Sequence, residues 1–140
     1  MSKDKKRKSP VMGISFPMTE DPTKKDKNYV LKPIEVTDEH LENVLVGAFE
    51  GGSNYWIRKV EVAKDDYKGK KYASECVAAG GELYIHTTDD TKCLLTKHSL
   101  INGLQKYLDE SKHKNWPDGG DAYTDDCILQ YALFEEVVYG

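Results

Sequence analysis

The sequence EGGSNYW at residues 50–56 is central to the predicted fold, because it marks the change from a predicted helix to a predicted strand. Gly51 and Gly52 lose more backbone entropy on folding than other residues, so a glycine pair is typical of a place where the chain turns or passes close to another group. Tyr55 and Trp56 follow at once. The stretch therefore predicts that a helix ends at the glycines and that a strand begins at Tyr55.

The segment before the glycine pair has the pattern of an amphipathic helix. Thr37 is a typical N-cap residue, and Asp38 and Glu39 place negative charge in the first turn, where the helix dipole favours it. The apolar residues recur at helical spacing on one face: Leu41, Val44, Leu45, Ala48 and Phe49. A short edge strand is expected over residues 32–36, because proline is tolerated at the start of a strand.

The segments after the glycine pair alternate between strand and helix patterns. Strands are predicted at residues 55–63, 82–87 and 92–95, with a hairpin turn at 88–91. Helices are predicted at residues 70–79, at 97–111, and from about 121–124 to 135. The expected fold is α+β, with a small, mostly antiparallel sheet of three or four strands packed with three or four helices.

Two helical features predict close packing. Gly103 lies inside a predicted helix, where glycine costs about 1 kcal/mol relative to alanine, so another element is expected to pass close to it. The last helix is apolar almost all the way round, which is typical either of a central helix or of a helix at a subunit interface. The second alternative predicts a homo-oligomer, with an interface formed by Leu133, Phe134, Val137 and Tyr139.

Charge divides the 140 residues into two predicted parts. Residues 1–32 contain nine basic residues (Lys and Arg) and four acidic residues (Asp and Glu). Residues 33–140 contain eleven basic and twenty acidic residues. The first part is predicted to be a flexible basic arm, because so polar a segment buries too few apolar side chains to offset the backbone entropy lost on ordering. The second part is predicted to be a single domain. The cationic residues proposed for the arm are Lys3, Lys5, Lys6, Arg7, Lys8, Lys24, Lys25 and Lys27.

Two interpretations of the basic arm remain open. Its Lys and Arg side chains could neutralise the phosphates of a nucleic acid, with an affinity that falls as salt rises. The arm could instead be a solvated tail that aids solubility or folds against the acidic domain. The second interpretation is favoured, because the sequence of the domain offers no basic face that would continue a nucleic-acid footprint.

The composition points to a cytoplasmic protein and makes an enzyme the less favoured interpretation. No apolar run approaches the ~18 residues of a membrane span, and the three cysteines lie far apart without a CxxC pair. The four histidines show no zinc-binding spacing, and no phosphate-binding glycine loop is present, so no metal or cofactor is expected. A small hydrolase or nucleotide-processing enzyme remains an alternative.

Side chains suited to binding gather at the glycine pair. An amide, two aromatic rings and a guanidinium could hold a nucleotide-like ligand or form a hot spot for a protein partner. The predicted binding set is Asn54, Tyr55, Trp56 and Arg58, with Asp121 and Gln130 as neighbours. The slightly favoured alternative is structural: Asn54 satisfies backbone groups after the turn, and Trp56 fills the core.

Several of these motifs together resemble a family of small proteins encoded by bacteriophages and mobile elements. The resemblance is carried by EGG at residues 50–52, NYW at 54–56, Gly103-Leu104, Asp121, Asp126, Gln130, Leu133-Phe134 and EVVYG at 136–140. It implies an accessory protein in the cytoplasm of a bacterial host, acting in host takeover or counter-defence by binding a host protein or small ligand. Glu135 stands where the pattern has a glycine, and the basic arm lies outside the pattern.

Overall fold

A computed structural model describes residues 34–140, and the residues from Asp38 to Gly140 form one compact unit. The predicted basic arm therefore lies outside the described residues, as do residues 32 and 33 of the expected first strand. The helices are α1 (Asp38–Gly47), α2 (Ala73–Cys76), α3 (Lys97–Glu110) and α4 (Ala122–Phe134). The strands are β1 (Ile57–Val62), β2 (Leu83–Thr87) and β3 (Lys92–Leu95), and short turns of π-helix (Ala48–Gly52) and 3-10 helix (Ala63–Asp65) precede and follow β1.

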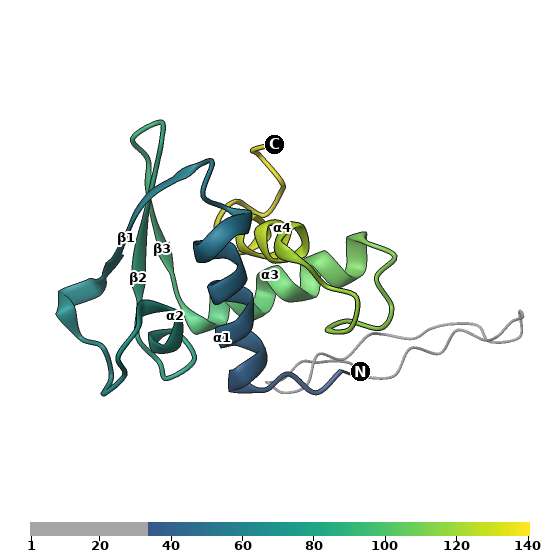
Figure 1. The fold of residues 1–140 in the computed structure, drawn as a ribbon, viewed down its shortest axis with the longest axis horizontal. Coiled ribbons are helices and arrows are strands. Elements are labelled where there is room, and N and C mark those ends of the chain that lie inside the picture. Colours follow the sequence, from purple (N-terminus) through teal and green to yellow (C-terminus); the bar gives the residue numbers. More distant parts are fainter. Residues whose placement is uncertain (1–33) are drawn as a thin grey trace, which may run out of the picture. The chain divides into compact units, whose positions relative to one another are not determined.

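The three strands form one antiparallel sheet in the order β1-β2-β3. Leu83, Ile85 and Thr87 of β2 are buried, whereas Tyr84 and His86 between them are partly exposed. This alternation is expected of a strand with one covered face. Figure 1 shows α1, α3 and α4 on one side of the sheet. The predicted α+β fold with a small antiparallel sheet is confirmed.

Helix α4 lies at the centre of the helical layer. Ile128 and Leu129 are fully buried, and the helix packs closely on α3 and on the end of α1. A methyl group on Gly103 of α3 would lie 2.5 Å from the backbone nitrogen of Ala132 in α4. The close approach predicted at Gly103 is therefore confirmed, and the buried part of α4 matches the central-helix alternative.

The end of the first helix differs from the prediction. Instead of stopping at a glycine C-cap, α1 widens into the π-helical turn, which the Ser53 N–H closes by donating to the Ala48 carbonyl at 2.9 Å. Gly52 is required here, because a Cβ atom would lie 2.1 Å from the carbonyl oxygen of Ala122. The glycine thus allows this turn to touch the start of α4.

Two other predicted elements are shorter or missing. Of the described residues of the strand expected over 32–36, Ile34 forms a single β-bridge, whereas Glu35 and Val36 are not part of a strand. The three-stranded sheet ends at β1 and β3. The helix expected over residues 70–79 is reduced to Ala73–Cys76, followed by a turn in which Gly81 N–H donates to the Cys76 carbonyl at 2.8 Å. A glycine pair at residues 80–81 and a short apolar run do not sustain a longer helix.

Candidate functional site

The buried carboxylate of Asp126 is the polar centre of the region where the EGGSNYW stretch meets α4. The Trp56 indole Nε1 and the Ser53 hydroxyl donate hydrogen bonds to Asp126 Oδ1 at 2.7 and 2.8 Å, and the Tyr55 hydroxyl donates to Oδ2 at 2.7 Å. Gln130 Nε2 is 3.1 Å from Oδ1. These donors replace the water that a buried carboxylate would otherwise require.

Gln130 holds the C-terminal segment, residues 135–140, against α4. Its Oε1 accepts hydrogen bonds from the backbone N–H groups of Val138 and Tyr139 at 2.7 and 2.8 Å. Its Nε2 lies 3.3 Å from the Tyr139 carbonyl oxygen, and the Tyr55 hydroxyl lies 3.2 Å from the same oxygen. Both the oxygen and the nitrogen of the fully buried Gln130 amide therefore form hydrogen bonds. These bonds join α4 to the C-terminal segment.

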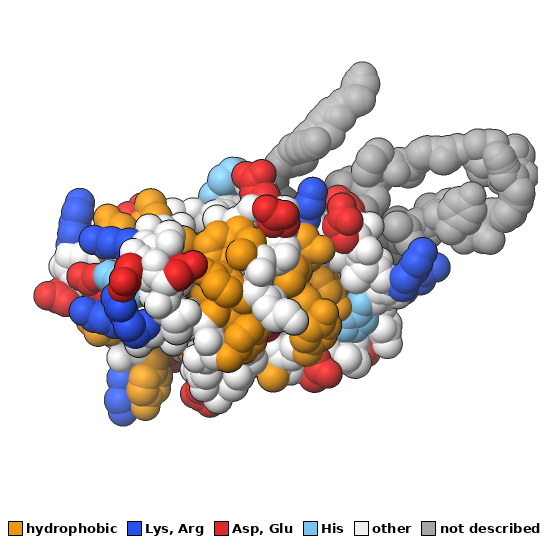
Figure 2. Space-filling view, turned by 90° about the horizontal axis from the view of Figure 1, so that it is seen from above, with side chains coloured by type: hydrophobic (Ala, Val, Ile, Leu, Met, Phe, Trp, Pro, Cys, Tyr) orange, Lys and Arg blue, Asp and Glu red, His pale blue; other side chains and the backbone are white. Residues whose placement is uncertain are grey.

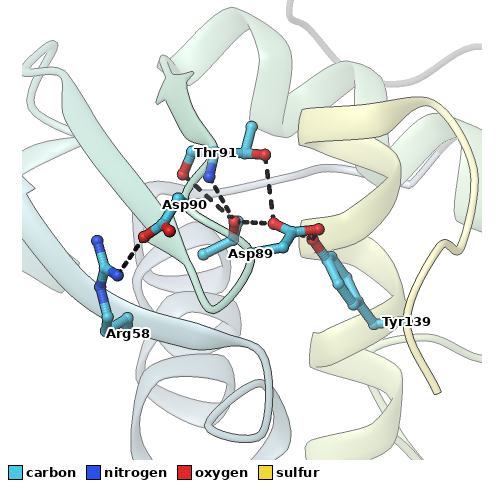
Figure 3. A network of polar contacts seen from close by, with 6 residues as sticks. Arg58, Asp89, Asp90, Thr91 and Tyr139 are labelled. Carbon is cyan, nitrogen blue, oxygen red and sulfur yellow. Dashed lines mark hydrogen bonds and ion pairs between the residues drawn. The ribbon is translucent and has the colours of Figure 1, made fainter.

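Tyr139 extends this network to the hairpin between β2 and β3. Its ring is stacked on Trp56, with centroids 5.0 Å apart and planes 4° from parallel, and its hydroxyl donates to Asp89 at 3.0 Å. Figure 3 shows Tyr139 and Thr91 pointing toward the Asp89 carboxylate from two sides. Hydrogen bonds from Thr87 and then Tyr139 hold the pKa of Asp89 below its ordinary value.

The hydrogen bonds around Asp126 satisfy the polar groups of this region. Both carboxylate oxygens of Asp126 accept hydrogen bonds, Oδ1 from Trp56 and Oδ2 from Tyr55. Burial and the hydrogen bond to Asp126 raise the pKa of Tyr55 to about 12, which keeps its hydroxyl protonated at neutral pH. Among residues 34–140, no three His, Cys, Asp or Glu side chains are grouped so as to hold a metal ion.

Asp125, the neighbour of Asp126, faces a different element. A Cβ atom on Gly47 of α1 would lie 1.8 Å from Asp125 Oδ2, so this glycine provides the room for the carboxylate. Burial and then the charge of Asp121 raise the pKa of Asp125 to about 7. The two adjacent aspartates thus point to different surroundings, Asp125 to Gly47 and Asp126 to Trp56.

The six residues predicted to bind a partner are divided between the core and the surface. Trp56 is only 1% exposed and Gln130 is fully buried, so both are structural in this conformation. Asp121 is the N-cap of α4, where its side chain accepts a hydrogen bond from the Thr124 N–H at 3.0 Å. Trp56 and Gln130 therefore support the surface from inside, whereas Asp121 caps α4 and remains exposed.

The other three members of the binding set are exposed. Asn54 lies in the turn before β1, and Tyr55 is 53% exposed although its hydroxyl donates a hydrogen bond to Asp126. Arg58 forms an ion pair with Asp90 at the tip of the hairpin, as Figure 3 shows. Since Tyr55 is exposed and its hydroxyl is hydrogen-bonded, it is the member of the set best suited to contact a partner.

The residues predicted to form a subunit interface are also divided. Leu133, Phe134 and Tyr139 are partly buried within the chain itself, because the rings of Phe134 and Tyr139 pack against Trp56. Val137 remains 42% exposed. The predicted interface stays a prediction, and Val137 is the member most available to another chain.

Exposed apolar side chains lie on the segments that adjoin the turn containing Tyr55, and we call the set Tyr55, Tyr123, Val137 and Val138 the Tyr55 face. Tyr123 is 71% exposed and Val138 is 53% exposed. The turn at Gly52 touches Ala122, and Gly140 lies against the Tyr55 hydroxyl, so α4 and the C-terminal segment both adjoin Tyr55. Figure 2, viewed from above, shows a hydrophobic area in the centre of one side of the molecule.

Sequence reasoning missed the role of Asp126 as the common acceptor. A signal was present, because Asp126 and Gln130 are four residues apart in an otherwise apolar helix and therefore share one face. Polar side chains on a buried face need partners. The donors at Ser53, Tyr55 and Trp56 could not be assigned to it from sequence, because they are 70 to 73 positions away.

Comparison of the chain with protein-family models, with curated proteins and with solved structures finds no match. None of the helices in the described part of the chain is long and apolar enough to cross a membrane.

Proposed function

We propose that the protein acts by binding another protein through the Tyr55 face and does not catalyse a reaction. The observation that carries this proposal is that Tyr55 is more than half exposed although its hydroxyl is hydrogen-bonded to Asp126 and Gln130. A side chain that is already fixed loses little entropy on binding, and tyrosine is enriched among the residues that dominate interface energies.

The surroundings of Tyr55 support the same function. Monomeric proteins rarely expose contiguous apolar patches without a use for them, and Tyr123, Val137 and Val138 extend the apolar area beyond a single side chain. The resemblance to bacteriophage and mobile-element proteins favours a bacterial host protein as the partner. Binding would then serve host takeover or counter-defence in the host cytoplasm.

Photo-crosslinking from the Tyr55 face tests this proposal. A photoreactive phenylalanine analogue replaces Tyr123, which is largely exposed, and the full-length protein is expressed in bacterial cells. We expect one host protein to be crosslinked at this position, and its yield to fall when Val138→Ser is added. A matched probe at Leu94, an exposed residue of β3, should not capture that protein. Equal capture from both positions, or no capture from Tyr123, would contradict the proposal.

Nucleic-acid binding through the basic arm is the second candidate function, and the excess of Lys and Arg in residues 1–32 favours it. Binding of this kind depends on phosphate neutralisation and weakens steeply with salt. A gel-shift series at increasing salt, with and without residues 2–27, tests it. A salt-insensitive complex, or one that survives removal of the arm, would exclude the arm as the binding element.

A further inference from the structure

We propose that the Tyr55 face binds a basic protein segment, one that presents Lys or Arg side chains around an aromatic or aliphatic anchor. This inference rests on the binding function proposed above and specifies the chemistry of the partner. It is carried by exposed apolar side chains on segments whose charged side chains are all acidic.

The segments that build the Tyr55 face contain no Lys or Arg. Residues 46–56 and 121–140 contain only acidic ionisable side chains besides tyrosine and cysteine. Asp126 is buried and already satisfied, and Asp125 is partly buried. The remaining acidic side chains of these segments are exposed to a partner: Glu50, Asp121, Glu135 and Glu136.

Basic residues are concentrated elsewhere in the described part of the chain. Residues 57–97, which contain the sheet, have eight basic residues (Lys and Arg) and seven acidic residues (Asp and Glu). Residues 34–56 and 98–140 together have three basic and thirteen acidic residues. Figure 2 shows most of the visible Lys and Arg side chains at the sheet end, with others beyond the opposite edge of the central hydrophobic area. Arg58, near the hairpin, is engaged by Asp90.

This charge distribution determines which partners the face attracts. A phosphate backbone would be repelled by it, whereas Lys and Arg side chains would gain favourable interactions at its edge while an apolar side chain covers Tyr55. Exposed charges act mainly on the association rate and are screened by salt. The apolar contact with Tyr55, Tyr123 and Val138 would supply the part of the affinity that salt leaves unchanged.

Two synthetic peptides of equal length test the proposal. They share the same Phe and Leu positions, but one has Lys and the other Glu at all charged positions. We expect the Lys peptide to bind the full-length, isotopically labelled protein and to shift the amide resonances of Tyr55, Tyr123 and Val138. The Glu peptide should bind at least about tenfold more weakly, and the affinity of the Lys peptide should fall as salt rises.

Variants of the protein separate the two contributions. The pair Tyr123→Ser and Val138→Ser should weaken the Lys peptide about tenfold or more at every salt concentration, with Leu94→Ser on the sheet as the matched control. The pair Glu50→Lys and Glu136→Lys should weaken it by a similar factor and reduce its salt dependence. The control for charge is Glu82→Lys, an exposed position just before β2.

The inference is overturned if the Lys peptide does not bind, if both peptides bind equally, or if the shifted resonances lie outside the Tyr55 face. Crosslinking from Tyr123 to residues 1–33 of the protein would also overturn it, because the face would then be occupied by the chain itself. Failure of this inference is distinguishable from failure of the proposed function. If a host protein is captured through a segment without Lys or Arg, the binding function stands and only the basic partner is wrong.

Discussion

At the level of single residues, the buried carboxylate of Asp126 explains why polar and aromatic side chains gather beside the glycine pair. A charged group in the core is tolerated only when hydrogen-bond donors surround it, and Ser53, Tyr55, Trp56 and Gln130 supply them. The motif that suggested a binding site is thus partly a structural motif. Tyr55 is the exposed aromatic residue of this motif.

Replacing Asp126 with alanine should destabilise the protein by about 3 kcal/mol, because the buried donors of Ser53 and Trp56 would lose their acceptor. The free energy of unfolding in urea measures the effect. The exposed Asp118→Ala variant is the control and should differ little from the parent. Equal stability of the two variants would show that the Asp126 network contributes nothing.

The raised pKa of Asp125 predicts a stability that depends on pH. Its pKa is about 7 in the folded protein and lies near 4 in the unfolded chain, so the folded state holds the proton more tightly between these values. Stability contributed by this group is therefore present at low pH and is lost as pH rises from about 4 to 7.

The Asp125→Asn variant should accordingly have a higher melting temperature than the parent at pH 8 and one close to the parent at pH 4, because the amide cannot ionise. Glu136→Gln, an exposed substitution in the C-terminal segment, controls for the change in net charge. The same shift at both pH values would mean that the carboxylate of Asp125 does not titrate as proposed.

At the level of elements, close contacts between backbones place α4 at the centre. Gly52 lets the π-helical turn touch the first residue of α4, and Gly103 lets α3 approach its last turn. Neither contact leaves room for a side chain. The two glycines therefore bring α4 close enough for Asp126 and Gln130 to reach their partners.

A Gly103→Ala substitution should destabilise the protein by about 1–3 kcal/mol, because the added methyl would overlap the backbone of Ala132. Gly51→Ala is a matched control, since no atom lies within 4 Å of its Cβ position, and it should be neutral or slightly stabilising. Thermal unfolding of both variants measures the difference. A tolerated Gly103→Ala would show that α3 and α4 can separate without cost.

The end of α4 offers a stabilising substitution. Glu135 has φ of 65° and ψ of 10°, the left-handed conformation that usually favours glycine after a helix. Glu135→Gly should therefore stabilise the protein by about 1 kcal/mol. Glu136→Gly is not expected to stabilise, because its backbone is not left-handed and glycine only adds entropy to the unfolded chain. Urea denaturation compares the two.

At the level of the whole compact unit, the C-terminal segment connects the helices to the sheet. Tyr139 stacks on Trp56, bonds to Gln130 through its backbone and reaches Asp89 in the hairpin with its hydroxyl. A residue near the end of the sequence thereby contacts three separate parts of the fold. The Tyr55 face depends on this segment, because Val137 and Val138 belong to it.

Tyr139→Ala should destabilise the protein by about 2 kcal/mol, because Trp56 loses the ring that covers one of its faces. Tyr139→Phe should cost much less, since it keeps the stacking and loses only the hydrogen bond to Asp89. Amide hydrogen exchange at Thr91 should accelerate in both variants if the hydroxyl steadies the hairpin. Unchanged exchange in Tyr139→Phe would confine the role of Tyr139 to its ring.

Local patterns were sufficient to predict the α+β class, the strands at residues 82–87 and 92–95, and the long helices, because periodicity and caps depend on neighbours in sequence. They also indicated that Gly103 faces another element. The length of α2 was overestimated, because a short helix is stabilised mainly by the packing around it. The π-helical turn after α1 was missed for a related reason, since it exists where Gly52 meets Ala122.

The sequence alone determined the order and type of the main elements and the surplus of acidic residues in the segments around Tyr55. Only the tertiary structure decided that Trp56 and Gln130 are internal, that Asp126 is their shared partner, and that Tyr55 stays exposed. The physical reason is distance along the chain. A buried carboxylate recruits whichever donors folding brings to it, and here those donors come from residues some 70 positions earlier.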